Sequence, residues 1–404
     1  MTVVVPKQDG GTSRIGRPES GQRILELDGL RGIAILSVML FHCFYFFPGP
    51  DYHAKDLVHH IYLFCERCIA VGWSGVDLFF VLSGFLIGGI LLDVRNSNYY
   101  YRTFYVRRFF RIVPVYYAVI VLYLLLASLG RPFFDAHVPG GAPIDVRHLL
   151  AQIFFLQNFG VLRHDVFLLG AWFWATWSLA VEEQFYLIVP LVIRRLSQQT
   201  LMIFLAAVIL GALILRLCLY HAFPANGVGL PLTYTLMPCR ADSLAIGILA
   251  VVLWREEGYR GWLQMHTRTM YWGVAFLFAG FAALAKWFPD HDSLAMISIG
   301  YTWIAAFYAS LLLLVLISPS GAFARMMRMA WLRELGRVSY CLYLIHGGTL
   351  FLLGTFLAVA LKHVASWEGI LLNAAAIPIC YSMARLSWTY FEHPLVKRGH
   401  SFKY

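Results

Sequence analysis

The feature that most constrains this chain is a series of long apolar segments. A helix needs about 20 apolar residues to cross the hydrocarbon core of a bilayer. Segments close to that length occur at 24–46, 73–92, 110–129, 172–193, 201–221, 232–254, 270–288, 294–317, 339–361 and 368–391. Only 13% of the residues are charged, roughly half the fraction usual in soluble proteins. The sequence therefore predicts an all-α polytopic membrane bundle of about ten transmembrane helices, since the apolar runs lack the alternation of barrel strands.

The positions of Lys and Arg predict how this bundle is oriented. If the amino terminus lies inside, 21 Lys and Arg residues fall in inner segments and 7 in outer segments. This bias satisfies the positive-inside rule if the weaker apolar run 148–160 does not cross the membrane. Both termini then lie in the cytoplasm. The net charge of +10 follows from this topology and does not indicate a nucleic-acid partner.

Three regions divide the chain. Residues 1–23 are polar and rich in Gly, Ser and Arg, which is typical of a disordered cytoplasmic tail. Residues 24–394 contain all the apolar segments and form one transmembrane domain, and residues 395–404 form a cytoplasmic C-terminal tail. The first apolar run lacks a small-residue cleavage site, so we expect a retained helix and not a signal peptide.

The first apolar segment carries a cation and an imidazole on one face. Arg31 and His42 are eleven residues apart in LDGLRGIAILSVMLFH. On a helix this spacing places both on the same face, about 16 Å apart along the axis. Two interpretations stay open for the residues taken singly. They mark a site or an ion path, or they are an arginine that reaches the headgroups and a histidine bonded in the core.

The second segment adds Asp77 at its outer start and Ser83 in its middle. Asp77 is expected at a depth similar to that of His42. It either orients and charges the His42 ring as an acid–imidazole pair or caps its own helix. Ser83 and Gly84 favour close helix packing, and Ser83 is also a candidate for the substrate path.

An inner loop after this segment is rich in arginine and aromatic residues, RNSNYYYRTFYVRRFFRIVP. Arg108 and Arg111 are three residues apart and share a helical face, with Arg107 adjacent. Guanidinium groups bind phosphate bidentately, so the cluster suits a phosphorylated cosubstrate. The alternative is an ordinary positive-inside anchor on anionic lipid.

Further ionisable residues lie deep in later segments. Glu182 and Glu183 point about 100° apart, so we expect one to line a polar cavity and the other to pair with Arg216 or Arg240. Arg240 and Asp242 are two residues apart and do not face each other, and both are candidates for the substrate path. Tyr343 and His346 share a face and could line the same path. Ionisable groups in a bilayer must converge on a polar interior.

Two functional classes fit this set of residues. One is an enzyme with an imidazole base in the membrane and an anionic cosubstrate at the inner arginines. The other is a proton-coupled exporter or flippase of a lipid-linked saccharide, although no repeated halves are evident. Cys65 and Cys68 suit a local disulfide in an oxidising compartment, and a lone CxxC pattern is weak for zinc, so we expect no metal site.

The sequence resembles the integral-membrane acyltransferase family 3, whose members are membrane O-acyltransferases. The matching stretches run in order from about residue 24 to 394: LDGLRGIAILSVMLFH, GVDLFFVLSGFLI, YYRTFYVRRFFRIVP, WSLAVEEQFY, RADSLAIG, SYCLYLIH and YFEHP. One departure is visible, because relatives often carry Pro one residue after the histidine at position 346, where this chain has Gly347.

The resemblance implies transfer of an acyl group, commonly acetyl from acetyl-CoA, to a hydroxyl of a carbohydrate or glycoconjugate. It implies a multi-pass protein of the plasma (inner) membrane, with acyl-CoA on the cytoplasmic side and no permanently bound cofactor. Carried over by motif, Arg31 and His42 are the signature pair, and Arg108 and Arg111 contact the coenzyme A phosphates. His42 then acts as the base, and Glu182, Glu183 or Asp77 orients its ring.

Overall fold

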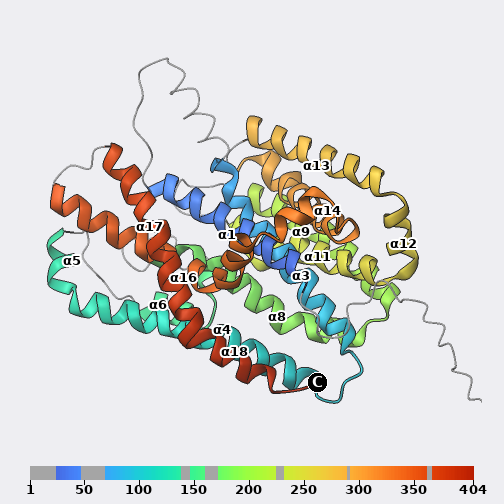
Figure 1. Ribbon diagram of the computed structural model, residues 1–404, viewed down its shortest axis with the longest axis horizontal. Coiled ribbons are helices and arrows are strands. Elements are labelled where there is room, and N and C mark those ends of the chain that lie inside the picture. The colour runs from blue at the N-terminus through green and yellow to red at the C-terminus, as the bar shows by residue number, and fades with distance from the viewer. Residues whose placement is uncertain are drawn as a thin grey trace, which may run out of the picture.

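The computed structural model describes residues 24–46, 69–137, 146–159, 172–223, 232–288, 292–361 and 366–404. These residues form helices and no strands (Figure 1). The segments that hold residues 1–23, Cys65 and Cys68, and most of the first outer loop lie outside the described residues. The predicted all-α membrane bundle is confirmed.

Eight helical stretches in the described part of the chain are long and apolar enough to cross a membrane. They contain α3 (Gly75–Asp93), α4 (Tyr100–Leu129), α8 (Trp177–Arg195), α9 (Gln198–Ala222), α11 (Met237–Arg255), α13 (Thr267–Trp287), α14 (Tyr301–Ile317) and α16 (Ala330–Leu361). Two further helices of 22 residues, α1 (Leu25–Phe46) and α17 (Ser366–Ser387), occupy the first and last predicted spans. Each of the ten predicted spans thus contains a long helix.

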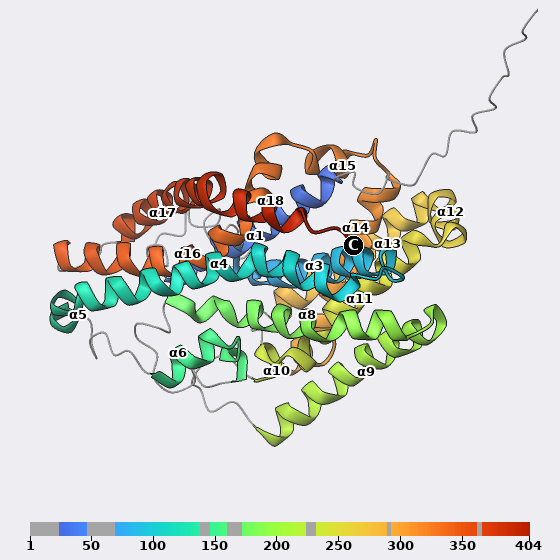
Figure 2. The same cartoon turned by 90° about the horizontal axis from the view of Figure 1, so that it is seen from below.

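Short elements connect the long helices. They are η1 (Val71–Ser74), α5 (Arg131–His137), α6 (Val146–Ile153), η2 (Gln157–Phe159), η3 (Trp174–Thr176), α10 (Leu232–Thr235), α12 (Glu257–Met265), η4 (Met296–Gly300), α15 (Ala322–Met327), η5 (Trp388–Glu392) and α18 (His393–His400). The eight residues of α6 extend only about 12 Å, so the run near 148–160 is too short to span a bilayer as a helix. Figures 1 and 2 show α5 and α12 at opposite ends of the bundle's long axis.

The arginine-rich segment predicted as an inner loop is helical instead. Helix α4 begins at Tyr100 and its 30 residues extend about 45 Å, which exceeds the hydrocarbon core. The apolar pattern located only the part that can lie in lipid, because a helix that leaves the bilayer no longer needs apolar side chains. The arginines therefore occupy fixed positions on one rigid element.

Helix α1 lies in the middle of the bundle in both views (Figures 1 and 2). It packs against α3, α14, α15, α16 and α17. Its contact with α16 is unusually close, because a Cβ atom on Gly336 would lie 1.8 Å from the carbonyl oxygen of Asp28. A Cβ atom on Gly32 would likewise lie 2.0 Å from the carbonyl oxygen of Leu332. Glycine at these positions lets the two backbones approach, as in other membrane helix pairs.

The Gly336→Ala variant is expected to destabilise the protein. The added methyl group would overlap the α1 backbone, and overpacking of this kind costs about 1–3 kcal/mol in the free energy of unfolding. The measurement is the thermal unfolding midpoint in detergent. Gly273→Ala on α13 is the matched control, because a Cβ atom at that position would meet no atom within 4 Å. Equal midpoints for the two variants would contradict the close α1–α16 contact.

Glycine also brings α3 against α11. A Cβ atom on Gly84 would lie 2.1 Å from the carbonyl oxygen of Leu244, and one on Gly247 would lie 2.2 Å from that of Val81. The predicted role of Gly84 in close packing is therefore confirmed.

Candidate functional site

A polar cavity of about 100 Å³ lies between α1, α3, α4, α8 and α16. Side chains from all five helices line it, and six of the predicted site residues are among them. The lining residues are Arg31, Val76, Phe79, Phe80, Ser83, Arg108, Arg111, Ile112, Ser178, Leu179, Glu182, Tyr186, Ser339, Tyr340 and Tyr343. Arginine side chains gather at one end, called the arginine end below. Tyr343 lines the cavity and packs against His346, and the pair of His42 and His346, which is not part of the lining, is called the histidine end.

Three guanidinium groups form the arginine end of the cavity. Arg108 and Arg111 come from one face of α4, and Arg31 joins them from α1. The Arg31 side chain is 27% exposed and lies 3.8 Å from the carboxylate of Asp28. The sequence placed Arg31 on the His42 face but did not show that it meets the α4 arginines. Their convergence concentrates positive charge where an anion can enter.

One face of α8 supplies the opposite wall of the arginine end. The hydroxyl of Tyr186 donates to Oε2 of Glu182 at 2.7 Å and lies 3.3 Å from the hydroxyl of Ser83. The guanidinium of Arg108 lies 5.5 Å from the centroid of the Tyr186 ring. Ser178, Glu182 and Tyr186 are spaced four residues apart and so share a helical face. The sequence analysis did not identify Ser178 and Tyr186, although their spacing of four residues from Glu182 places them on its face.

Arg107 lies outside the cavity, contrary to its predicted place in the phosphate-binding cluster. Its Nη2 and Nε atoms donate to the carbonyl oxygen of Phe402 at 2.6 and 2.9 Å. Its guanidinium also lies 4.7 Å from the centroid of the Tyr404 ring. Adjacent helix positions point about 100° apart, so Arg107 cannot share the face of Arg108. Arg107 instead fastens the C-terminal segment to α4.

The C-terminal segment, predicted as a tail, is folded as α18 and packs along α4 (Figures 1 and 2). The hydroxyl of Thr103 donates to the carbonyl oxygen of Lys403 at 2.8 Å. Burial lowers the pKa of His400 below its ordinary value, and nearby guanidinium groups lower it further. These are the groups of Arg107, Arg111 and Arg108. The positive potential of the cluster thus extends to α18.

Tyr343 connects the cavity to the histidine end. Its hydroxyl donates to the carbonyl oxygen of Ala175 at 2.8 Å and lies 2.6 Å from the hydroxyl of Ser178. Its ring centroid lies 5.5 Å from that of His346, one helical turn further along α16. The predicted common face of Tyr343 and His346 is therefore confirmed.

His42 and His346 form a buried pair at the histidine end. Nδ1 of His42 lies 2.7 Å from Nε2 of His346, and the two ring planes are within 8° of parallel. The indole of Trp174 packs edge-on against His42, with the ring centroids 4.2 Å apart. Trp172 lies against Gly348, where a Cβ atom would come within 2.3 Å of the indole ring. The absence of a side chain at Gly348 thus makes room for Trp172.

Asp77 does not pair with His42 as expected. It forms an ion pair with Arg240, and Arg216 forms a second ion pair with Asp242. Asp77 accepts hydrogen bonds from Arg240 and from the hydroxyl of Ser243. Nη1 of Arg216 donates to Oδ2 of Asp242 at 2.8 Å. All four ion-pairing side chains are fully buried, and none lines the cavity. The sequence indicated only the depth of each residue in the membrane. Depth does not show in which direction a side chain points, so it could not predict these partners.

The two ion pairs serve as a cross-link between helices, and the substrate-path candidates Arg240 and Asp242 do not line the polar cavity. Arg216 on α9 also donates to the carbonyl oxygens of Ile297 and Cys239, and Thr302 on α14 donates to Asp242 at 2.6 Å. A buried arginine that satisfies several acceptors at once fixes the helices around it. Neither Glu182 nor Glu183 takes Arg216 or Arg240 as a partner, because Asp242 and Asp77 hold these arginines.

Glu183 points away from the cavity that Glu182 lines, as their 100° separation predicts. Its Oε1 atom is buried and has no hydrogen-bond partner among the described residues. Glu183 is therefore not placed to orient His42.

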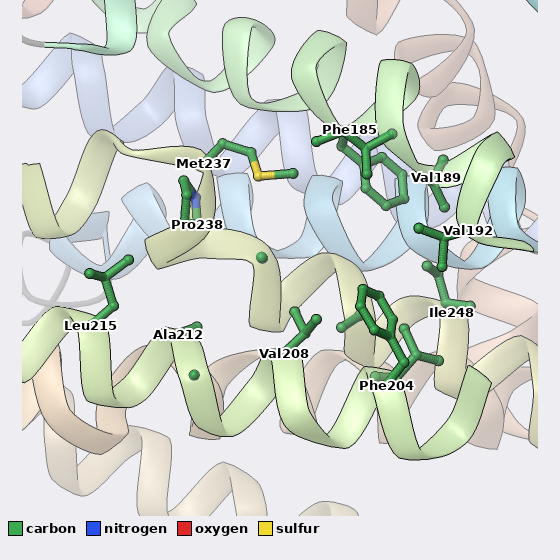
Figure 3. Close-up of a pocket in the computed structure, with 15 residues that line it drawn as sticks. Phe185, Val189, Val192, Phe204, Val208, Ala212, Leu215, Met237, Pro238 and Ile248 are labelled. Atoms are coloured by element: carbon green, nitrogen blue, oxygen red, sulfur yellow. The ribbon is translucent and has the colours of Figure 1, made fainter. Parts of the chain in front are cut away.

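A second and larger cavity is apolar throughout. It measures about 350 Å³ and lies between α8, α9 and α11. Figure 3 shows Phe185, Val189 and Val192 facing Phe204 and Val208 across it, and the labelled side chains that line it are all apolar. It therefore offers no group for acid–base chemistry. Within the described ranges, no cluster of three or more His, Cys, Asp or Glu side chains is placed to hold a metal ion.

Comparison with known proteins assigns a family to this arrangement. The family model described as "Acyltransferase domain" matches residues 24–385, which include every residue that lines the polar cavity. The chain belongs to this acyltransferase family. No solved structure matches the chain.

Curated relatives of the chain in the family are O-acetyltransferases by name. "O-acetyltransferase OatA" of Staphylococcus aureus (strain NCTC 8325 / PS 47) is 24% identical over 404 residues, which cover 96% of this chain and 59% of the relative. "Peptidoglycan O-acetyltransferase OatA" of Listeria monocytogenes is 26% identical over 399 residues, covering 94% of this chain and 57% of the relative. The chain thus spans less than three fifths of the length of these relatives.

Proposed function

We propose that this chain is a membrane O-acyltransferase that moves an acetyl group from acetyl-CoA to a sugar hydroxyl of a surface polysaccharide or glycosylated metabolite. The observation that carries the proposal is the polar cavity, which is lined by three guanidinium groups and by Tyr343, whose ring packs against His346 of the buried histidine pair. A proton-coupled exporter would not need the guanidinium cluster at one end. The acetyl group and the glycan acceptor are supported by the names of the relatives.

Acetyl-CoA binds with its phosphates at the arginine end in this proposal. Arg31, Arg108 and Arg111 offer donors in the fork geometry that suits phosphate oxygens. The positive-inside bias supports a cytoplasmic location for this end, where acyl-CoA is available. The pantetheine arm then follows the cavity past Ser83 and Tyr343. Arg31 and His42 are eleven residues apart on α1, so the thioester has about 16 Å to cross.

His42 is the general base at the far end of this path. It takes the proton of the acceptor hydroxyl as the hydroxyl oxygen attacks the thioester carbonyl carbon. The bond between carbon and sulfur breaks, and the coenzyme A thiolate leaves. The proton then passes from His42 to this sulfur, so that ester and free thiol are the products. No covalent acyl-enzyme is required.

The acceptor reaches His42 from the opposite side of the membrane to acetyl-CoA. His42 lies near the end of α1 that faces away from the arginine cluster. The segments 47–72 and 130–171 follow helix ends on that side and are expected to select the acceptor. The plasma (inner) membrane is the location that suits such a reaction, because cytoplasmic acetyl-CoA and a surface glycan then lie on its two sides.

Radiolabelled acetyl-CoA tests the proposed function. The purified chain in detergent is expected to transfer labelled acetyl to a mixed glycan pool or, slowly, to water. Labelled acetate in place of acetyl-CoA is the control, and it is expected to give no transfer because the reaction requires the thioester. If no acyl-CoA binds or turns over with any acceptor, the enzyme proposal fails and the exporter interpretation takes its place.

A further inference from the structure

The hydrogen bonds of His346 determine where its own proton lies. Nδ1 of His346 lies 2.7 Å from the backbone carbonyl oxygen of Tyr343. A carbonyl oxygen can only accept, so this nitrogen must carry a hydrogen. In a neutral imidazole the other nitrogen is then an acceptor. Nε2 of His346 therefore presents a lone pair to His42.

The same reasoning fixes the tautomer of His42. Its Nδ1 lies 2.7 Å from that lone pair, so Nδ1 of His42 must donate. The near-parallel rings, with centroids 4.9 Å apart, have the geometry of a hydrogen bond in the ring plane. Nε2 of neutral His42 is then left without a hydrogen, so its lone pair can accept a proton.

We propose that His346 is a positioning residue that holds His42 in the tautomer with its proton on Nδ1 and its lone pair on Nε2. This inference rests on the proposed function, in which His42 is the base. Two hydrogen bonds in series form a relay: Nδ1 of His42 donates to Nε2 of His346, and Nδ1 of His346 donates to the carbonyl oxygen of Tyr343. It performs the orienting task that a carboxylate performs in many catalytic triads, but with a neutral group.

Two structural features hold the rings of His42 and His346 in their hydrogen-bonded arrangement. The glycine contacts of Gly32 and Gly336 bring α1 and α16 close enough for the two rings to meet. Trp174 packs on His42 and limits rotation of the ring. Asp77, which would have placed a negative charge beside His42, is held by Arg240 instead. The Nε2 atom is therefore the single proton-accepting site that the pair offers.

Nitrogen-15 NMR of the ring-labelled protein tests the tautomer directly. The His42 signals are assigned by their loss in His42→Asn. We expect a neutral His42 ring with a protonated Nδ1 and an unprotonated Nε2 in the wild-type protein. A protonated Nε2 in the neutral ring, or rapid averaging between the two tautomers, would overturn the proposal. This measurement needs neither an acceptor nor turnover.

Two substitutions of His346 test its effect on the reaction. His346→Leu removes the acceptor at similar volume and is expected to lower kcat by about 10²–10⁴-fold, with the KM for acetyl-CoA little changed. His346→Gln restores an acceptor oxygen and is expected to recover at least about tenfold of that loss. A glutamine variant no better than the leucine variant at equal thermal stability would contradict the positioning role.

The outcomes separate this inference from the proposed function. If His42→Ala keeps full turnover, the proposed base is wrong whatever the NMR result. If His42→Ala loses turnover but His346→Leu keeps it, only the positioning role of His346 is wrong. If the leucine variant does not fold, the wild-type spectrum and the glutamine variant still decide the tautomer and the rescue.

Discussion

The His42→Ala variant is expected to lose about 10²–10⁴-fold in kcat for acetyl transfer while it keeps its affinity for acetyl-CoA. The substitution removes the proposed base from the histidine end. It leaves the guanidinium groups untouched, because Arg31 lies about 16 Å away along α1 and Arg108 and Arg111 come from α4. Steady-state transfer of labelled acetyl gives kcat, and equilibrium binding of coenzyme A gives the affinity.

Cys43→Ala is the matched control for this variant. Cys43 is the next residue on α1 and is also buried, and it packs in an apolar cluster with Leu350 and Ala376. Its substitution is expected to leave kcat within about threefold of the wild-type value, as for other small changes in packing. If His42→Ala and Cys43→Ala have the same kcat, the loss is structural and His42 is not the base.

The double variant Arg108→Ala with Arg111→Ala is expected to raise the Kd for acetyl-CoA by about 100-fold or more. A hydrogen bond to a charged group contributes about 1.5–3 kcal/mol, and the variant removes two guanidinium groups that line the cavity. At saturating acetyl-CoA the kcat is expected to change little, since the histidine pair is intact. The measurement is donor titration at fixed ionic strength, because salt screens these contacts.

Arg107→Ala is the control that the structure provides for the arginine pair. It removes one cation from the same helix, but its guanidinium is bonded to the Phe402 carbonyl and does not line the cavity. Its Kd for acetyl-CoA is expected to stay within a few-fold of the wild-type value. If the double variant weakened only acceptor binding, the assignment of acetyl-CoA to the arginine end would be wrong.

The sequence was sufficient to predict the long helices and six of the residues that line the polar cavity. Apolar length determines where a helix can lie in lipid, and all ten predicted spans contain helices. Residue spacing predicted that Arg31 and His42 share a face and that Glu182 and Glu183 do not. These predictions depend only on local helical geometry, and the structure places the side chains accordingly.

The partners of the buried charges could not be predicted in the same way. Asp77 was expected near His42 because both lie at similar depth, yet it contacts Arg240 on α11. The choice depends on which helices are neighbours, and the glycine contacts between α3 and α11 decide it. Likewise, nothing in the local pattern of residues 395–404 showed that Phe402 would accept hydrogen bonds from Arg107.

The most direct test of the account is the side from which acetyl-CoA is used. Sealed membrane vesicles of known orientation are supplied externally with labelled acetyl-CoA, which does not cross the bilayer. Inside-out vesicles, with the arginine end outward, are expected to consume the donor and to carry label on the acceptor in the lumen. Right-side-out vesicles should do so only after detergent opens them. Equal use of external acetyl-CoA by intact right-side-out vesicles would contradict a donor site at the cytoplasmic arginines.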